Sequence, residues 1–181
     1  MTEMPADLTG EFGYMSEADM TVLRNYARAL GPPFLNVGCF KGLSCSVFAT
    51  IGPTTCIDTF AGGDTCPAKD FQETWEANMN AYGVRDNITL YRGDSAVVMT
   101  VLGSQPKFYN VIFIDADHRY PYVLNDLRMA KLLVQSGGAV LFDDVAIDRN
   151  GEQPVTKAAN VVFGKNAWTV EGDKVGVWRA P

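Results

Sequence analysis

Two short apolar runs, at 111–114 and 139–142, are conspicuous in the pattern of hydrophobic and polar positions because each ends abruptly on carboxylates. The first run is followed by Asp115, and the second by Asp143 and Asp144. Runs without polar positions are typical of strands covered on both faces, as in parallel sheets. The helical pattern between the runs, closed by a glycine pair at 137–138, predicts a strand–helix–strand crossover.

The rest of the chain continues this alternation of strands and helices. Apolar runs predict strands at 34–37, 54–57 and 88–91, and two runs at 168–170 and 175–178 flank a turn and predict a β-hairpin. Helices are expected from Ser16 to Leu30 and at 43–51, 71–82, 95–102 and 154–163. The expected fold is therefore one α/β domain over residues 1–181, with a doubly wound, mostly parallel sheet and an antiparallel C-terminal hairpin.

Composition narrows the classes of function. The net charge is -6 and the basic residues are not clustered, so we expect no nucleic-acid partner. No apolar run approaches the ~20 residues of a membrane span, and the acidic N-terminus does not resemble a signal peptide, so we expect no membrane partner and a cytoplasmic protein. The 4 cysteines form no CxxC pair and there is 1 histidine, which argues against zinc and for reduced thiols.

The aspartates after the two central strands carry the strongest chemical signal. Both strands of a right-handed crossover end at the same sheet edge, so Asp115, Asp143 and Asp144 are expected in the crevice where open α/β sheets hold ligands. Three carboxylates in one crevice repel one another unless a cation or a shared proton compensates. Oxygen ligands suit a hard cation, so the pattern predicts a divalent metal, with Mg²⁺ the expected ion. The alternative is that Asp143 and Asp144 cap a loop or helix.

The first strand and the turn after it predict a nucleotide-like cofactor. Gly38 and Gly42 lie in this turn, and Asp58, at the end of the second strand, is well placed to accept hydrogen bonds from ribose hydroxyls. Phe40 occupies the place of the middle glycine in the dinucleotide fingerprint, where its side chain would obstruct a pyrophosphate. The pattern therefore favours an adenosine cofactor without phosphates. The alternative is a tight turn that needs glycine for packing.

Five motifs follow one another in order: NVGCFKG, IDTF, RGDS, FIDADHRY and GGAVLFDD. This series resembles class I S-adenosylmethionine-dependent methyltransferases. More narrowly, it is similar to the metal-dependent O-methyltransferases of the catechol and caffeoyl-CoA type and to the related enzymes acting on macrolide and aminocoumarin sugars. The resemblance runs from about Gly13 to the C-terminal hairpin. It implies a seven-stranded sheet with the last strand antiparallel, and methyl transfer to a hydroxyl of a small phenol, catechol or sugar-like molecule.

The resemblance also implies roles for individual residues. It assigns S-adenosylmethionine contacts to residues from five parts of the chain, namely Met15, Ser16, Asn36, Gly38, Gly42, Asp58, Asp94, Ser95, Asp115 and Asp117. Asp115, Asp143 and Asp144 match the metal ligands of the family. The sequence departs from the catechol type in two places, since Asp144 replaces a common asparagine and His118 replaces the lysine base.

The expected mechanism is attack of a metal-bound hydroxyl, whose pKa the metal lowers, on the sulfonium methyl group. His118 is the expected general base because histidine ordinarily titrates near pH ~6.5, with Asp117 as the second candidate. A lone histidine is also commonly structural. A homodimer is expected from family analogy alone, and loop 61–69 is expected to move over the site. Two alternatives remain open: an NAD(P)-type nucleotide-dependent oxidoreductase, and a non-catalytic domain that binds the cofactor or a metal.

Overall fold

A computed structural model of the protein describes residues 13–62, 69–104, 108–148 and 151–181. Its helices and strands, in chain order, are α1 (Glu17–Leu30), β1 (Phe34–Val37), α2 (Leu43–Ala49), β2 (Thr54–Asp58), α3 (Gln72–Ala81), a 3₁₀ turn (Arg85–Asn87), β3 (Ile88–Arg92), α4 (Ser95–Gly103), β4 (Tyr109–Ile114), α5 (Tyr120–Leu133), β5 (Val134–Phe142), α6 (Pro154–Phe163), β6 (Trp168–Glu171) and β7 (Val175–Arg179). The predicted loop 61–69 and Cys66 fall mostly or wholly outside the described residues.

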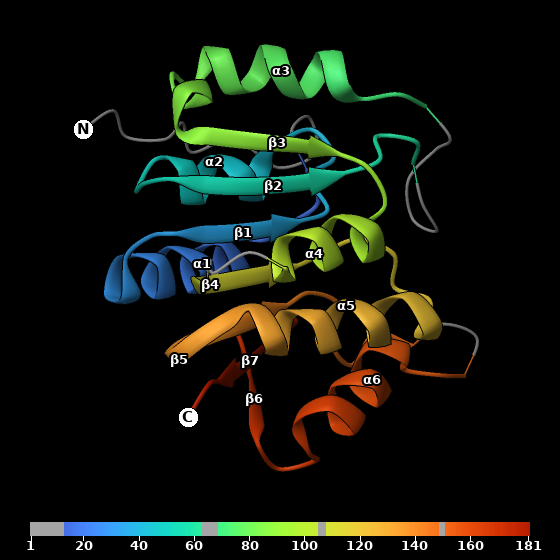
Figure 1. Ribbon diagram of the computed structural model, residues 1–181. Coiled ribbons are helices and arrows are strands. Elements are labelled where there is room, and N and C mark those ends of the chain that lie inside the picture. The colour runs from blue at the N-terminus through green and yellow to red at the C-terminus, as the bar shows by residue number, and fades with distance from the viewer. Residues whose placement is uncertain (1–12, 63–68, 105–107, 149–150) are drawn as a thin grey trace.

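The strands form one seven-stranded sheet in the order β3-β2-β1-β4-β5-β7-β6. The first five strands of this order are parallel, and β7 lies antiparallel to both β5 and β6. Helices α4, α5 and α6 cover one face of the sheet, while α1 and α2 cover the other (Figure 1). The predicted doubly wound sheet with an antiparallel C-terminal hairpin is therefore confirmed. The extent of the domain over residues 1–181 stays a prediction.

The apolar runs became central strands because both faces of the sheet are covered. All four residues of β1 are buried, and so are five of the six residues of β4.

Helix α1 begins where the sequence predicted, since the Ser16 hydroxyl accepts a hydrogen bond from the Asp19 backbone N–H at 3.1 Å. Among the helices described, none is long and apolar enough to cross a membrane.

The glycine pair at 137–138 does not close a helix, and this part of the prediction was wrong. Helix α5 ends at Leu133, and β5 begins at the next residue and continues through both glycines. The register between β4 and β5 shifts between Tyr109 and Val111, so the glycines form an irregularity in the strand. A Cβ on Gly138 would lie 2.7 Å from the Asn110 carbonyl oxygen, which explains the need for glycine there.

Candidate functional site

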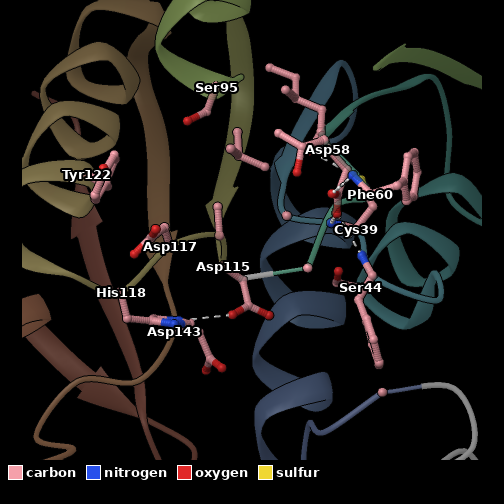
Figure 2. Close-up of a pocket in the computed structure, with 18 of the residues that line it drawn as sticks. Cys39, Ser44, Asp58, Phe60, Ser95, Asp115, Asp117, His118, Tyr122 and Asp143 are labelled. Carbon is pink, nitrogen blue, oxygen red and sulfur yellow. Dashed lines mark hydrogen bonds and ion pairs between the residues drawn. The ribbon is translucent and has the colours of Figure 1, made fainter. Parts of the chain in front are cut away.

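The carboxyl ends of four parallel strands meet at one edge of the sheet. Val37 pairs with both Ile57 and Ile114, and Ile114 pairs with Phe142. The ladder continues past the strands, since the Asp115 N–H donates to the Val37 carbonyl at 2.8 Å. A cavity of about 510 Å³ opens at this edge, within the range of small-molecule sites. Figure 2 shows Cys39, Asp58 and Phe60 on one of its walls and Asp117, His118 and Tyr122 on the other.

Most of the predicted site residues line this cavity together: Met15, Gly38, Asp58, Asp94, Ser95, Asp115, Asp117, His118, Asp143 and Asp144. Ser16, Asn36 and Gly42 are not among its lining residues. Each of these three has a contact within the fold instead. Ser16 caps α1, and the buried Asn36 amide donates to the Gly38 carbonyl at 2.9 Å. A Cβ on Gly42 would lie 2.3 Å from the Met79 methyl carbon.

The turn after β1 needs glycine for a physical reason. Gly38 has φ 87°, in the left-handed region, and a Cβ there would lie 1.9 Å from the Asp115 carbonyl oxygen. The turn is therefore pressed against the end of β4, and no side chain fits between them. The closeness of these two segments brings the predicted cofactor turn directly beside the acidic residues that follow β4.

Asp58 holds the cofactor turn in place. Its Oδ2 accepts hydrogen bonds from the backbone N–H groups of Cys39 at 2.5 Å and Phe40 at 2.9 Å. Its Oδ1 accepts one from the N–H of Phe60 at 2.6 Å. A carboxylate offers about four acceptor positions, so one remains for a ligand hydroxyl at this end of the cavity. The role of Asp58 as ribose acceptor stays a prediction.

An aromatic wall beside Asp58 was not predicted as part of the site. Phe40 stacks on Tyr14 with ring centroids 5.7 Å apart and meets Phe71 edge-on at 4.7 Å. Phe40, Phe60, Tyr14 and Phe71 all line the cavity. The side chain of Phe40 thus occupies the wall where a dinucleotide fold presents bare backbone to a pyrophosphate. The sequence marked Phe40 as an obstruction but gave no sign that its neighbours would gather around it.

Asp94 and Ser95, which the sequence predicted as S-adenosylmethionine contacts beside the adenine, also stabilise the start of α4 and its packing. The Asp94 carboxylate caps α4 by accepting from the Ala96 N–H at 2.9 Å. The Ser95 hydroxyl donates to Asp126 Oδ1 at 2.8 Å. Burial raises the pKa of Asp126 to about 6, and the hydrogen bond from Ser95 opposes this rise. The Asp126 carboxyl, on α5, thereby fixes the orientation of Ser95 at the cavity wall.

The acidic residues form a rim on the far side of the cavity. His118 Nε2 lies 3.3 Å from Asp115 Oδ1 and 3.6 Å from Asp144 Oδ2, so the imidazole bridges two of the three predicted metal ligands (Figure 2 shows its contact with Asp115). Asp117 is engaged differently, because its carboxylate accepts hydrogen bonds from the Arg119 guanidinium, including one from Nε at 2.9 Å. His118 therefore faces the rim, whereas Asp117 is held by a neighbouring cation.

Lys174 completes the rim and was missed in the sequence. Its Nζ lies 2.8 Å from Asp143 Oδ2 and 2.5 Å from Asp144 Oδ1. Burial lowers the pKa of Lys174, but the charges of both carboxylates outweigh it and raise the pKa overall. Burial and the neighbouring Asp115 charge raise the pKa of Asp143 to about 7, against the pull of Lys174. We take the Lys174 ammonium as charged, since all its contacts at the rim are with carboxylates.

The rim in this arrangement does not fit a divalent ion. Mg²⁺ binds carboxylate oxygens at ~2.1 Å, so an ion held by the oxygens that Lys174 contacts would lie within roughly 5 Å of the ammonium. A unit charge and a double charge at that distance repel by roughly 7 kcal/mol at an effective dielectric constant of about 20. Divalent binding therefore requires Lys174 to leave the position that it occupies. The ligand set of Asp115, Asp143 and Asp144 stays a prediction.

A cluster of sulfur atoms lies beneath the cofactor turn. The Sγ atoms of Cys39, Cys45 and Cys56 lie within 4.8 Å of one another, and among the described residues they are the one such group that could hold a metal. Cys45 accepts hydrogen bonds from Trp75 Nε1 and the Asn36 amide, both at 3.4 Å. Burial raises the pKa of the Cys39 and Cys56 thiols, which favours their neutral form. The three cysteines form no CxxC pair, so their spacing gave no indication of this cluster.

Comparison with known proteins agrees with the geometry. A family model described as a methyltransferase domain matches residues 35–145, from β1 to the acidic rim. The uncharacterized protein R132 of Acanthamoeba polyphaga mimivirus is 26% identical over an alignment of 140 positions, which covers 74% of this chain and 62% of that protein. This chain therefore spans less than two thirds of the length of that relative.

Several methyltransferases of known structure share the fold. The O-methyltransferase TomG of Streptomyces achromogenes, in complex with S-adenosylmethionine, has a TM-score of 0.72 at 18% identity and covers 95% of this chain and 83% of its own. The O-methyltransferase of Bacillus cereus has a TM-score of 0.69 at 14% identity, covering 90% and 80%. CalS11, a TDP-rhamnose 3'-O-methyltransferase of calicheamicin biosynthesis, has a TM-score of 0.63 at 17% identity, covering 89% and 78%. With more than half of the sequence matched by the family model, this chain belongs to the methyltransferase domain family.

Proposed function

We propose that the protein transfers a methyl group from S-adenosylmethionine to a hydroxyl of a small phenol, catechol or sugar-like molecule. The observation that carries the proposal is the position of the cavity: most of its lining residues, from Val37 to Asp144, lie within the segment matched by the methyltransferase family. The hydroxyl acceptor is supported by the O-methyltransferase activities of TomG and CalS11, which share the fold.

The cofactor belongs on the wall formed by the ends of β1 and β2. There Gly38 lines the cavity beside the methionine part, and Met15 lines it from the N-terminal side. Asp58 presents its remaining acceptor position to the ribose, and Ser95, oriented by Asp126, borders the adenine. Asn36, Ser16 and Gly42 act through the fold around the cavity, whereas Asp94 lines the cavity itself and Asp117 lines the opposite wall.

The reacting oxygen belongs near the acidic rim, where His118 is the proposed general base. The acceptor hydroxyl gives its proton to the imidazole, the oxygen forms a bond to the methyl carbon, and the sulfur–methyl bond breaks to leave S-adenosylhomocysteine. Holding both reactants in line contributes ~7–11 kcal/mol in favourable cases. Asp117 is the weaker candidate for the base because Arg119 already engages its carboxylate. The predicted Mg²⁺ enters no step, since the rim as arranged does not fit it.

Transfer of a radiolabelled methyl group tests this proposal. The protein would be incubated with methyl-labelled S-adenosylmethionine and a panel of phenols, catechols and nucleotide sugars, and labelled products would be counted. We expect His118→Ala to reduce turnover by roughly 10²–10⁴-fold, as for loss of a general base. Lys165→Ala, at an exposed position after α6, is the matched control and should leave turnover unchanged.

Two results would favour the alternatives. Calorimetric binding of S-adenosylhomocysteine without transfer to any acceptor would indicate a non-catalytic cofactor-binding domain. Quenching of protein fluorescence by NADH, with no response to S-adenosylhomocysteine, would indicate a nucleotide-dependent oxidoreductase instead. The homodimer and the cytoplasmic location stay predictions, and sedimentation of the purified protein tests the first of them.

A further inference from the structure

The turn between β6 and β7 is fixed to the body of the protein on both sides of Lys174. Asp19, fully buried on α1, accepts hydrogen bonds from the backbone N–H groups of Asp173 at 2.8 Å and Lys174 at 3.2 Å. The Lys174 carbonyl in turn accepts from the Val145 N–H at 3.0 Å. The turn is therefore attached both to α1 and to the segment that follows the acidic rim.

Gly172, at the tip of this turn, packs closely against Asp19 of α1. Gly172 has φ 65°, and a Cβ there would lie 2.6 Å from Asp19 Oδ1 and 3.2 Å from the Asp19 backbone N. Only glycine therefore allows the turn to approach α1 closely enough for both hydrogen bonds to Asp19. The backbone that carries Lys174 is positioned by the fold, in contrast to that of a lysine on a mobile surface loop.

The side chain of Lys174 is directed by the strand register. Phe142 of β5 pairs with Gly176 of β7, and in an antiparallel pair the next positions bring Asp144 opposite Lys174. The ammonium lies between two carboxylates at 2.8 Å and 2.5 Å, and its side chain is 23% exposed. It lines the same cavity as His118 and Asp58. A cation is thus already present at the point where the sequence predicted a divalent metal.

We propose that Lys174 is the built-in cation of the acidic rim and that methyl transfer by this protein needs no divalent metal. The inference rests on the proposed function of the same site and deepens it. Lys174 acts as a positioning residue: its ammonium contacts Asp143 and Asp144 and offsets one of their two negative charges, while His118 lies against Asp115, so that an acceptor hydroxyl meets a rim that already holds a cation. This replaces the ion expected from the sequence with a residue of the chain itself.

Binding of Mn²⁺, followed by electron paramagnetic resonance, tests this inference without any acceptor. We expect wild-type protein and Lys174→Arg to show no specific Mn²⁺ site, because each keeps a cation on the rim. Lys174→Met keeps the apolar stem but removes the charge, and it should bind Mn²⁺ at least about 100-fold more tightly than wild type, since a repelling cation within roughly 5 Å is gone. Adding Asp143→Asn to Lys174→Met should remove this site, and Lys165→Met is the matched control.

Measurement of methyl transfer provides a second test of this inference. Wild-type turnover should be unchanged by EDTA, whereas Lys174→Met should lose turnover and regain part of it on addition of Mg²⁺. A tight Mn²⁺ site in the wild-type protein, or loss of wild-type turnover in EDTA, would overturn the inference even if Lys174→Met failed to fold. Binding of S-adenosylhomocysteine, measured on the same samples, separates this outcome from failure of the proposed function, because cofactor binding does not depend on which cation neutralises the rim.

Discussion

Several residues around the cavity adopt backbone conformations that their side chains disfavour. Among the described residues, four non-glycine residues have positive φ, and three of these, Phe40, Phe60 and Asp144, line the cavity. Such conformations cost on the order of 1–3 kcal/mol each and are kept where the surrounding structure imposes them, commonly at functional sites. No local sequence rule predicts a left-handed phenylalanine, so this part of the site could not be foreseen.

Gly38 provides the sharpest stability prediction at this scale. Gly38→Ala should lower the free energy of unfolding by roughly 3 kcal/mol or more, because the new Cβ would lie 1.9 Å from the Asp115 carbonyl oxygen at φ 87°. Gly83→Ala is the matched control: Gly83 has φ 66° but nothing lies within 4 Å of the added Cβ, so its cost should stay near ~1 kcal/mol. Urea denaturation measures both, and equal losses would contradict this explanation of the turn.

Asp126 makes a pH-dependent contribution whose sign is fixed by its surroundings. Burial raises its pKa from 3.8 to about 6, with smaller upward contributions from the charges of Asp94 and Asp117. A carboxyl whose pKa is raised on folding stabilises the fold fully below pH 3.8, and the contribution is lost as pH rises through about 6. A shift of about 2 units corresponds to roughly 3 kcal/mol.

Asp126→Asn tests this contribution, because asparagine keeps the neutral form at every pH. Compared with this variant, the wild-type protein should lose up to roughly 3 kcal/mol of stability between pH 4 and pH 8. Chemical denaturation at a series of pH values measures the difference. A difference that stays flat across this range would show that the Asp126 carboxyl titrates normally. Asp86→Asn, at an exposed position, is the control.

At the scale of elements, Asp19 joins α1 to the β6–β7 hairpin. Its carboxylate accepts from the Ser16 hydroxyl at 3.0 Å and from two backbone N–H groups of the hairpin turn. Asp19→Ala leaves these buried donors without partners and should cost roughly 3 kcal/mol of stability. Asp86→Ala, which is exposed, should cost less than ~0.5 kcal/mol. Urea denaturation of both variants measures this difference. A small loss of stability in Asp19→Ala would mean that other contacts hold the turn.

The elements themselves were largely predictable. Apolar runs and helical spacing predicted each strand and helix within a few residues, because strands covered on both faces contain few polar positions. The start of β5 was wrong, since the glycine pair at 137–138 looked like a helix end and instead forms a strand irregularity. That outcome depends on the close approach of Asn110 from a neighbouring strand, which no local pattern records.

At the scale of the whole molecule, the crossover rule correctly predicted that Asp115, Asp143 and Asp144 share one edge of the sheet. Lys174 could not be placed in the same way, because its position depends on the pairing of β7 with β5. If the antiparallel pairing of β7 with β5 were known from the sequence, its register would place Lys174 opposite Asp144. The position of the cation on the rim is thus determined by the topology and is not visible in any single motif.

The central claim is that the cavity at the ends of β1, β2 and β4 holds an S-adenosyl cofactor. Isothermal titration of S-adenosylhomocysteine into the purified wild-type protein tests it most directly. We predict saturable binding with one cofactor per chain, weakened at least roughly tenfold in Asp58→Ala, since a hydrogen bond to a charged group contributes about 1.5–3 kcal/mol. Absence of binding to a wild-type protein that unfolds cooperatively would contradict the assignment of this cavity and the methyl transfer built on it.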